Sequence, residues 1–229
     1  MAPTLVIAID GPAGSGKSSV SQAVASRLGL AYLDTGAMYR AATWAVLDRG
    51  IDPDDTDAVA ALMTADAAPA IESGTDPAAP FIRVDGVDVA EAIRGELVTS
   101  AVSAVSAVGA VRQGMVDLQR EHAHASSGIV VEGRDIGSVV LPQADIKVFL
   151  TANPSVRAQR RAAEVNVEDA GLVSATEDAL RARDAKDTTR AISPLAPAEG
   201  SIEIDTTNLT FDDVVDAVIS LVRDAPEGR

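Results

Sequence analysis

The sequence predicts an α/β fold built on a parallel sheet, and two observations predict it. Short apolar segments alternate along the chain with segments whose apolar residues recur at helical spacing, as they do in βαβ units. A glycine-rich stretch, Gly11-Pro12-Ala13-Gly14-Ser15-Gly16-Lys17-Ser18, joins the first apolar segment to the first helical one. Because ligands of such sheets bind beyond the carboxyl ends of the strands, we expect the functional residues at these junctions.

The strands and helices of the sheet layers follow from these patterns. The predicted strands are 4–10, 31–34, 128–132, 146–150 and 201–205. Helical periodicity predicts helices over 17–28, 36–49 and 154–164. Two more helices have capping signatures, in which a Ser or Thr precedes an acidic residue by three positions: Ser174 with Glu177, and Thr210 with Asp213.

The region from 54 to 127 departs from this alternation. It predicts short antiparallel strands at 70–72, 81–84 and 87–89, with Asp85-Gly86 as the hairpin turn between the last two, and helices near 98–108 and 111–125. We interpret it as a substrate-holding insertion between the second and third strands of the sheet. The chain is then a single domain, 1–229, with a core of 1–50 and 128–229 and an insertion at about 51–127. The polar segment 166–171 is predicted to be the tip of a mobile flap.

Composition limits the class of protein and its partners. Hydrophobic residues make up 47% and charged residues 23% of the chain, as in a globular protein. A net charge of −15 disfavours nucleic acid and anionic membranes as partners, and no apolar run is long enough to span a bilayer. The lack of cysteine suits a cytoplasmic protein, and the acidic surface favours a monomer. Among the 19 basic residues only Lys17, Lys147 and Lys186 are lysines, so arginine is expected to bind most anions.

The glycine-rich stretch fits the phosphate-loop pattern G-x-x-x-x-G-K-[ST]. Such a loop points successive backbone N–H groups at one anion, in front of the positive end of a helix dipole. Lys17 would reach the outer phosphates, and the Ser18 hydroxyl could reach a magnesium ion. An ordinary glycine-rich turn is the alternative, but the strand, the spacing, the lysine and the serine together favour a nucleoside triphosphate site.

Two other strand ends also carry functional side chains. After the second strand, Thr35 could cap the following helix, and Arg40 lies just over one turn inside it. After the third, two glycines bracket Arg134 and Asp135, which favours a ligand-binding turn over an ordinary ion pair.

Two arginine clusters have open interpretations. Arg183, Asp187 and Arg190 fall at i, i+4 and i+7, while Arg157, Arg160 and Arg161 fall at i, i+3 and i+4. Solvated ion-pair ladders are one reading, and positive charge that closes over a triphosphate is the other. His122 and His124 lie two residues apart on a predicted helix, face different directions and are assigned no role.

Taken together, these motifs resemble those of bacterial cytidylate kinases from end to end. The segments that carry the resemblance are the phosphate loop, Asp34-Thr35-Gly36-Ala37-Met38-Tyr39-Arg40 and Gly133-Arg134-Asp135-Ile136-Gly137. The resemblance implies a three-layer P-loop kinase core with a five-stranded parallel sheet, an inserted NMP-binding subdomain and a helical lid at about 155–190. It also implies transfer of the γ-phosphoryl group of ATP to CMP or dCMP, which gives CDP or dCDP and ADP.

The same resemblance implies roles for individual residues. ATP would be bound by Gly11, Pro12, Ala13, Gly14, Ser15, Gly16, Lys17, Ser18 and Ser19. Arg40, Arg134 and Arg190 would hold the monophosphate, Ser103, Arg112 and Asp135 the cytosine, and Arg183 and Asp187 the ribose, with Thr35 lining the same pocket. Lys17, Arg134, Arg157 and Arg161 would be catalytic. Magnesium would be held by Ser18, with Glu132 as a candidate through water; Glu132 stands where aspartate is frequent in the family.

Other functions remain open from the sequence. One is a small-molecule kinase of the same fold that acts on AMP, UMP or a sugar acid. Another is a partner-binding ATPase that hydrolyses ATP without an acceptor. The chain has no Asn-Lys-x-Asp and no Asp-x-x-Gly switch element, so a GTPase is disfavoured.

Overall fold

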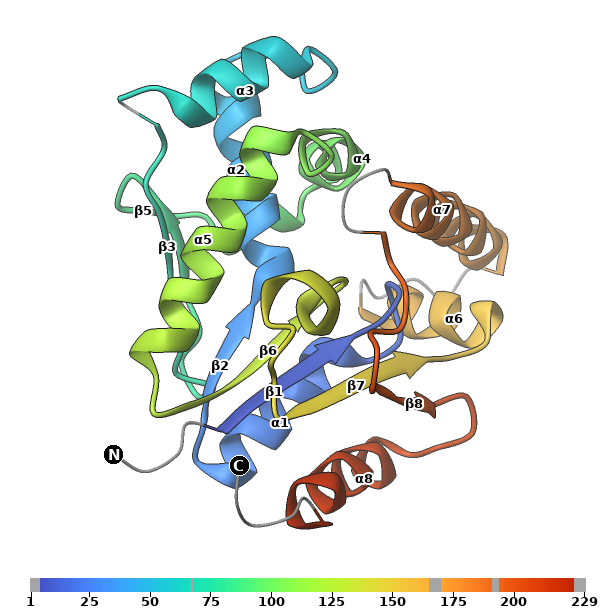
Figure 1. The fold of residues 1–229 in the computed structure, drawn as a ribbon. Coiled ribbons are helices and arrows are strands. Elements are labelled where there is room, and N and C mark those ends of the chain that lie inside the picture. The colour runs from blue at the N-terminus through green and yellow to red at the C-terminus, as the bar shows by residue number, and fades with distance from the viewer. Residues whose placement is uncertain (1–4, 67, 165–169, 191–193, 225–229) are drawn as a thin grey trace.

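The computed structural model describes residues 5–66, 68–164, 170–190 and 194–224 and shows an α/β fold. A parallel sheet runs through the middle, with helices on both faces (Figure 1). Its strands, in the spatial order β2-β6-β1-β7-β8, are β1 (Leu5–Asp10), β2 (Ala31–Asp34), β6 (Gly128–Gly133), β7 (Ile146–Thr151) and β8 (Ile202–Asp205). All neighbouring pairs are parallel, so the carboxyl ends of β1, β2 and β6 meet at one edge. The five-stranded parallel sheet predicted from the sequence is confirmed.

Two apolar cores flank the sheet because side chains alternate between its faces. Helices α1 (Lys17–Leu28) and α8 (Phe211–Asp224) cover one face through a cluster that includes Ile7, Ile9 and Val130. The other face packs against α2 (Thr35–Asp48) and α5 (Gly109–Ala125) through Ala8, Ile129 and Val131. Figure 1 shows α8 below the sheet and α2 with α5 above it.

The segment between β2 and β6 contains a second, smaller sheet. Its elements are α3 (Thr56–Thr64), β3 (Ile71–Ser73), β4 (Ile82–Val84), β5 (Val87–Asp88), a short 3₁₀ turn η1 (Ala92–Arg94), α4 (Glu96–Val105) and α5. The strands pair antiparallel in the order β3-β4-β5. Asp85 and Gly86 both have positive φ, 51° and 79°, which is the geometry of the hairpin turn that their sequence predicts.

Two helices lie at the carboxyl end of the sheet, opposite this segment. They are α6 (Pro154–Glu164) and α7 (Ala170–Thr189), which pack against each other. In Figure 1 both helices stand to the right of the phosphate loop, and α4 lies to the left of α7. The predicted flap tip at 166–171 falls largely on 165–169, which lies outside the described residues. The proposed boundaries of core, insertion and lid stay a prediction.

Two capping predictions were wrong, and one was confirmed. The side chain of Asp34, rather than Thr35, caps α2 by accepting from the Ala37 N–H; Thr35 is the first helical residue and donates its hydroxyl to the Glu132 carbonyl at 2.6 Å. Ser174 lies within α7, which already begins at Ala170, so its signature marks no helix start. Thr210 and Asp213 do form a reciprocal capping box at the start of α8.

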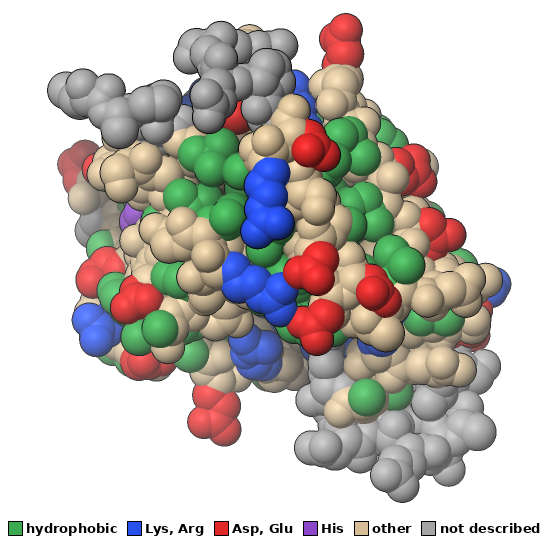
Figure 2. Space-filling model, turned by 90° about the horizontal axis from the view of Figure 1, so that it is seen from below, with side chains coloured by type: hydrophobic (Ala, Val, Ile, Leu, Met, Phe, Trp, Pro, Cys, Tyr) green, Lys and Arg blue, Asp and Glu red, His purple; other side chains and the backbone are tan. Residues whose placement is uncertain are grey.

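The lower face of the molecule mixes both signs of charge. Figure 2, seen from below, shows basic side chains interspersed with acidic ones and with scattered apolar groups. On this side Arg27 of α1 forms ion pairs with Asp212 and Asp216 of α8, at 2.6 and 2.8 Å. Among the described helices, none combines the length and the apolar character needed to cross a membrane.

Candidate active site

The phosphate loop leaves β1 at Gly11 and enters α1 at Lys17. Gly11, Gly14 and Gly16 have positive φ values of 150°, 74° and 89°, which only glycine adopts without strain. A Cβ on Gly11 would lie 2.0 Å from the Leu150 carbonyl oxygen, so the loop also needs glycine to pass close to β7. The Nζ of Lys17 donates to the Pro12 carbonyl at 2.7 Å and so points back into the loop. The glycine positions of the motif therefore serve both conformation and packing.

Lys17 of the loop and Glu132 of β6 interact electrostatically, and both are buried. Burial, and after it the positive charge of Arg134, lowers the pKa of Lys17 to about 7. Burial and the nearby Asp34 raise the pKa of Glu132 to about 7, against the opposing effect of Lys17. Burial thus disfavours the charged form of both groups in the free protein, and an anion bound in the loop would favour the charged lysine.

The Ser18 hydroxyl and the Glu132 carboxylate form an oxygen pair at the mouth of the loop. Ser18 donates to Oε2 of Glu132 at 3.0 Å, and the Tyr32 hydroxyl donates to Oε1 at 2.6 Å. Hydroxyl and carboxylate oxygens are the hard ligands that magnesium prefers, and this ion commonly takes only one or two protein ligands beside phosphates and water. The donor set therefore fits magnesium.

Asp10 connects the phosphate loop to the turn after β6. Its carboxylate accepts from the backbone N–H groups of Ile136 at 2.9 Å and Gly137 at 2.8 Å. Burial raises the pKa of Asp10 to about 6, although these two N–H groups oppose the shift. The turn continues into a π-helical segment, η2 (Ile136–Val140). Asp135 is thereby held at a fixed place relative to the loop.

Two arginines connect the loop to the helices α6 and α7. Arg134 donates from Nη1 to the Gly11 carbonyl and from Nε to Asp187, both at 2.7 Å. Arg157 donates to the carbonyls of Ala152 and Ala13, at 3.1 and 3.0 Å, and forms an ion pair with Asp184. In this conformation Arg157 is buried and holds the loop through the Ala13 carbonyl, whereas Arg134 lies between the loop and α7.

Arginines from separate elements face one another across the carboxyl edge of the sheet. Burial and the neighbouring Arg134 and Arg40 lower the pKa of Arg183 to about 10. Burial, followed by the charge of Arg161, likewise lowers the pKa of Arg40, which donates to Ile93 and Thr99 of the insertion. Like charges held this close raise the free energy of the empty site, so the cluster is suited to bind an anion.

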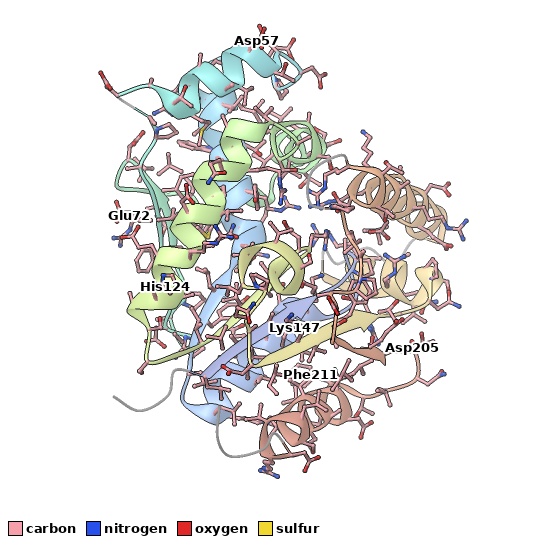
Figure 3. The ribbon with its side chains drawn as sticks, in the orientation of Figure 1. Asp57, Glu72, His124, Lys147, Asp205 and Phe211 are labelled. Atoms are coloured by element: carbon pink, nitrogen blue, oxygen red, sulfur yellow. The ribbon has the colours of Figure 1, made fainter. Side chains whose placement is uncertain are left out.

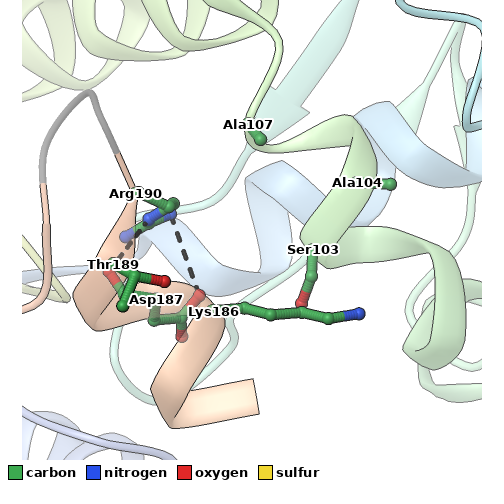
Figure 4. A pocket seen from close by; sticks show the side chains of 7 residues that line it. All are labelled: Ser103, Ala104, Ala107, Lys186, Asp187, Thr189 and Arg190. Atoms are coloured by element: carbon green, nitrogen blue, oxygen red, sulfur yellow. Dashed lines mark hydrogen bonds and ion pairs between the residues drawn. The ribbon is translucent and has the colours of Figure 1, made fainter. Parts of the chain in front are cut away.

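A pocket of about 360 Å³ opens between α4 and the end of α7. It is lined by Ser103, Ala104, Ala107, Lys186, Asp187, Thr189 and Arg190. Figure 4 shows Ser103 on α4 pointing toward the α7 side, where Asp187 and Arg190 contact each other. The Nη2 of Arg190 is buried without a hydrogen-bond partner. An arginine with an open donor at the wall of a pocket is suited to bind an anionic ligand.

Another buried ion pair links the insertion to the turn after β6. Arg112 of α5 donates to Asp135, and each side chain is about 5% exposed. The Arg112 guanidinium also lies over the Tyr39 ring, 5.4 Å from its centre, and its Nε has no hydrogen-bond partner. This pair offers both a donor and an acceptor, as the edge of a base requires.

The structure brings most of the predicted acceptor-site residues to one edge of the sheet: Arg40, Arg112, Arg134, Asp135, Arg183, Asp187 and Arg190. The two histidines lie elsewhere, on α5, and His124 is across the molecule from α7 (Figure 3).

Sequence reasoning missed several residues of this site. Tyr32 was assigned only to a strand, Asp10 only to the end of an apolar segment, and Asp184 and Lys186 were given no role. Only Asp10 had a usable signal, because it is an acidic residue directly before the phosphate loop. The contacts of Tyr32 and Asp184 join residues far apart in the sequence, so no local pattern announces them.

Comparison with known proteins gives the family. A family model described as cytidylate kinase matches residues 7–224. The cytidylate kinase of Streptomyces avermitilis is 54% identical, over 97% of this chain and 94% of its own. That of Streptomyces coelicolor is 56% identical, over 100% of this chain and 96% of its own.

Solved structures agree at the level of the fold. A gluconokinase from Sinorhizobium meliloti aligns with a TM-score of 0.50 and 15% identity, over 97% of this chain and 94% of its own. TT1252 from Thermus thermophilus also has a TM-score of 0.50, with 16% identity, over 99% of this chain and 100% of its own. Identities this low show a shared fold alone. The family model and the two Streptomyces relatives go further: this chain belongs to the cytidylate kinase family.

Proposed function

We propose that the protein transfers the γ-phosphoryl group of ATP to CMP or dCMP, giving ADP and CDP or dCDP. One observation carries the proposal beyond the family name: Arg134 joins the phosphate loop to the pocket between α4 and α7. It bonds to the Gly11 carbonyl of the phosphate loop on one side and to Asp187, which lines the pocket, on the other. A group so placed can contact a phosphoryl group as it passes from a donor to an acceptor.

The loop supplies the donor half of the site. Its backbone N–H groups and Lys17 would hold the phosphates of ATP, and the charged state of Lys17 would be favoured as they bind. Ser18 and Glu132 would hold magnesium, which supplies charge neutralisation at the phosphates when it is bound. The Ser18 side chain is exposed at the mouth of the loop, as such a role requires.

The pocket and its surroundings supply the acceptor half. Arg40, Arg190 and Arg134 would bind the monophosphate, and Asp187 with Arg183 the ribose. Arg112, Asp135 and Ser103 would bind the cytosine edge, for which the Arg112–Asp135 pair offers complementary donors and acceptors. No strong general base is needed, because the attacking phosphate oxygen is already anionic near neutral pH. Catalysis would then consist of positioning and charge stabilisation of an in-line transfer.

An acceptor panel tests this proposal. Purified protein with ATP and magnesium should form diphosphate rapidly with CMP or dCMP and slowly with UMP, AMP or a sugar acid. Equal ATP consumption with AMP, or without any acceptor, would contradict it and favour the other kinase or the ATPase.

A pocket variant tests the assignment of the two halves. Arg190→Ala should raise KM for CMP by about 10- to 100-fold, the range expected for a lost hydrogen bond to a charged group, and change KM for ATP less than about threefold. Glu72→Gln is the matched control, because Glu72 is exposed on β3 and far from α7 (Figure 3). If Arg190→Ala raised KM for CMP and for ATP by the same factor, the assignment of Arg190 to the acceptor half would be refuted.

A further inference from the structure

The carboxylate of Glu132 is held at both of its oxygen atoms. Oε2 accepts from Ser18 at 3.0 Å, and Oε1 accepts from Tyr32 at 2.6 Å. Glu132 is 3% exposed and Tyr32 4%, so water competes little for the bond between them. Thr35 donates to the main-chain carbonyl of Glu132 and therefore fixes its backbone, not its carboxylate. The orientation of the carboxylate thus depends on the two hydroxyls.

Tyr32 reaches this carboxylate from the neighbouring strand. In the register of the sheet Tyr32 pairs with Val130, and Asp34 pairs with Glu132. Tyr32 therefore lies two residues before the position opposite Glu132, and its side chain is on the same face of the sheet as that of Glu132. Its ring belongs to the apolar cluster between the sheet and α1, which also contains Val24 and Val130. The core therefore fixes the ring, and only the hydroxyl extends to the polar edge where Ser18 lies.

The hydroxyl acts on a side chain with considerable freedom. Glutamate has three side-chain torsions, and the last of these is soft. A phenol that donates to a carboxylate makes a charge-assisted bond, roughly twice as strong as a neutral one. Outer partners of this kind orient metal ligands and matter to metal affinity nearly as much as the ligands themselves.

We propose that Tyr32 is a positioning residue for the metal, acting through Glu132. Its hydroxyl fixes Oε1, and Oε2 is thereby kept beside the Ser18 hydroxyl, in the oxygen pair that would hold magnesium and its waters. The inference rests on the proposed function for the identity of the metal, but it does not depend on which acceptor is used.

Manganese, a paramagnetic substitute for magnesium, provides the test. Binding of Mn²⁺ in the presence of ADP, followed by electron paramagnetic resonance, should be about tenfold weaker in Tyr32→Phe than in the wild type. The magnesium concentration for half-maximal activity should rise by a similar factor, while KM for CMP stays within about twofold. Tyr39→Phe is the matched control: the Tyr39 ring lies under the Arg112 guanidinium, and the hydroxyls that the Glu132 carboxylate accepts from are those of Ser18 and Tyr32, so manganese binding should not change.

A second background separates positioning from packing. In Glu132→Asp the carboxylate is one methylene shorter and withdraws from the Tyr32 hydroxyl, so adding Tyr32→Phe should weaken manganese binding less than twofold further. Equal weakening in both backgrounds would show that Tyr32 acts through the core and would overturn the inference, as would unchanged manganese binding in Tyr32→Phe. Because binding is measured without an acceptor, a wild-type protein that phosphorylates no CMP would count against the proposed function alone.

Discussion

At the scale of single residues, burial sets the chemistry of this site more than residue type does. Lys17 has an ordinary pKa of 10.5, but burial and Arg134 bring it to about 7. Glu132 moves from 4.5 to about 7 for the same reason, with Asp34 adding to the effect. The phosphate-loop motif identifies the lysine from sequence alone, yet it does not reveal that burial lowers the pKa of this lysine.

This depressed pKa predicts proton uptake when ATP binds. Burial lowers the pKa of Lys17 in the free protein to about 7, and bound phosphates raise it, so ATP binding at pH 8 without magnesium should take up protons. Calorimetry at pH 8 in two buffers with different ionisation enthalpies measures the number of protons. Lys17→Arg is the control, because a guanidinium stays charged and this variant should take up clearly fewer protons. Similar uptake in both proteins would mean that another group titrates.

At the scale of elements, apolar periodicity and turn residues predicted strands, helices and the hairpin correctly, two capping signatures did not hold, and the long-range arrangement was not accessible from the sequence. The apolar segments gave the five parallel strands, and Asp85-Gly86 gave the hairpin, because both depend on neighbouring residues. The capping signature at Ser174 was wrong, since the helix around it extends back to Ala170. The strand order β2-β6-β1-β7-β8 and the approach of the loop to β7 depend on contacts between distant segments, which periodicity does not contain.

The contact between the loop and β7 predicts unequal costs for two glycine substitutions. Gly29→Ala, at the end of α1, should destabilise the protein by about 1–2 kcal/mol, because φ is 66° but a Cβ there would meet no atom within 4 Å. Gly11→Ala should cost more than about 3 kcal/mol, because its Cβ would overlap the rigid backbone of Leu150. Urea unfolding of both variants measures the difference. Equal costs would show that the loop can move away from β7.

At the scale of the whole molecule, a strongly acidic protein concentrates its arginines at one edge of the sheet. The net charge is −15, yet Arg40, Arg134 and Arg183 come together from three parts of the chain. Burial lowers the pKa of Arg40 and of Arg183, and the positive charge of Arg134 adds to both shifts. The arrangement attracts anionic substrates to the site while the rest of the surface repels polyanions. The same concentration of charge is a source of instability as long as no anion is bound.

This instability predicts a specific response to divalent anions. Sulfate should raise the melting temperature more than sodium chloride at equal ionic strength, because a bound anion stabilises the folded state by mass action and relieves the repulsion between the arginines. Arg183→Ala should lose at least half of that excess, since it removes one member of the cluster. Arg27→Ala should retain it, because Arg27 is paired with Asp212 and Asp216 on the opposite side of the sheet. Thermal unfolding of the wild type and both variants in each salt measures the effect. If sulfate raised the melting temperature above the sodium chloride value by the same amount in all three proteins, the sulfate effect would lie outside the arginine cluster.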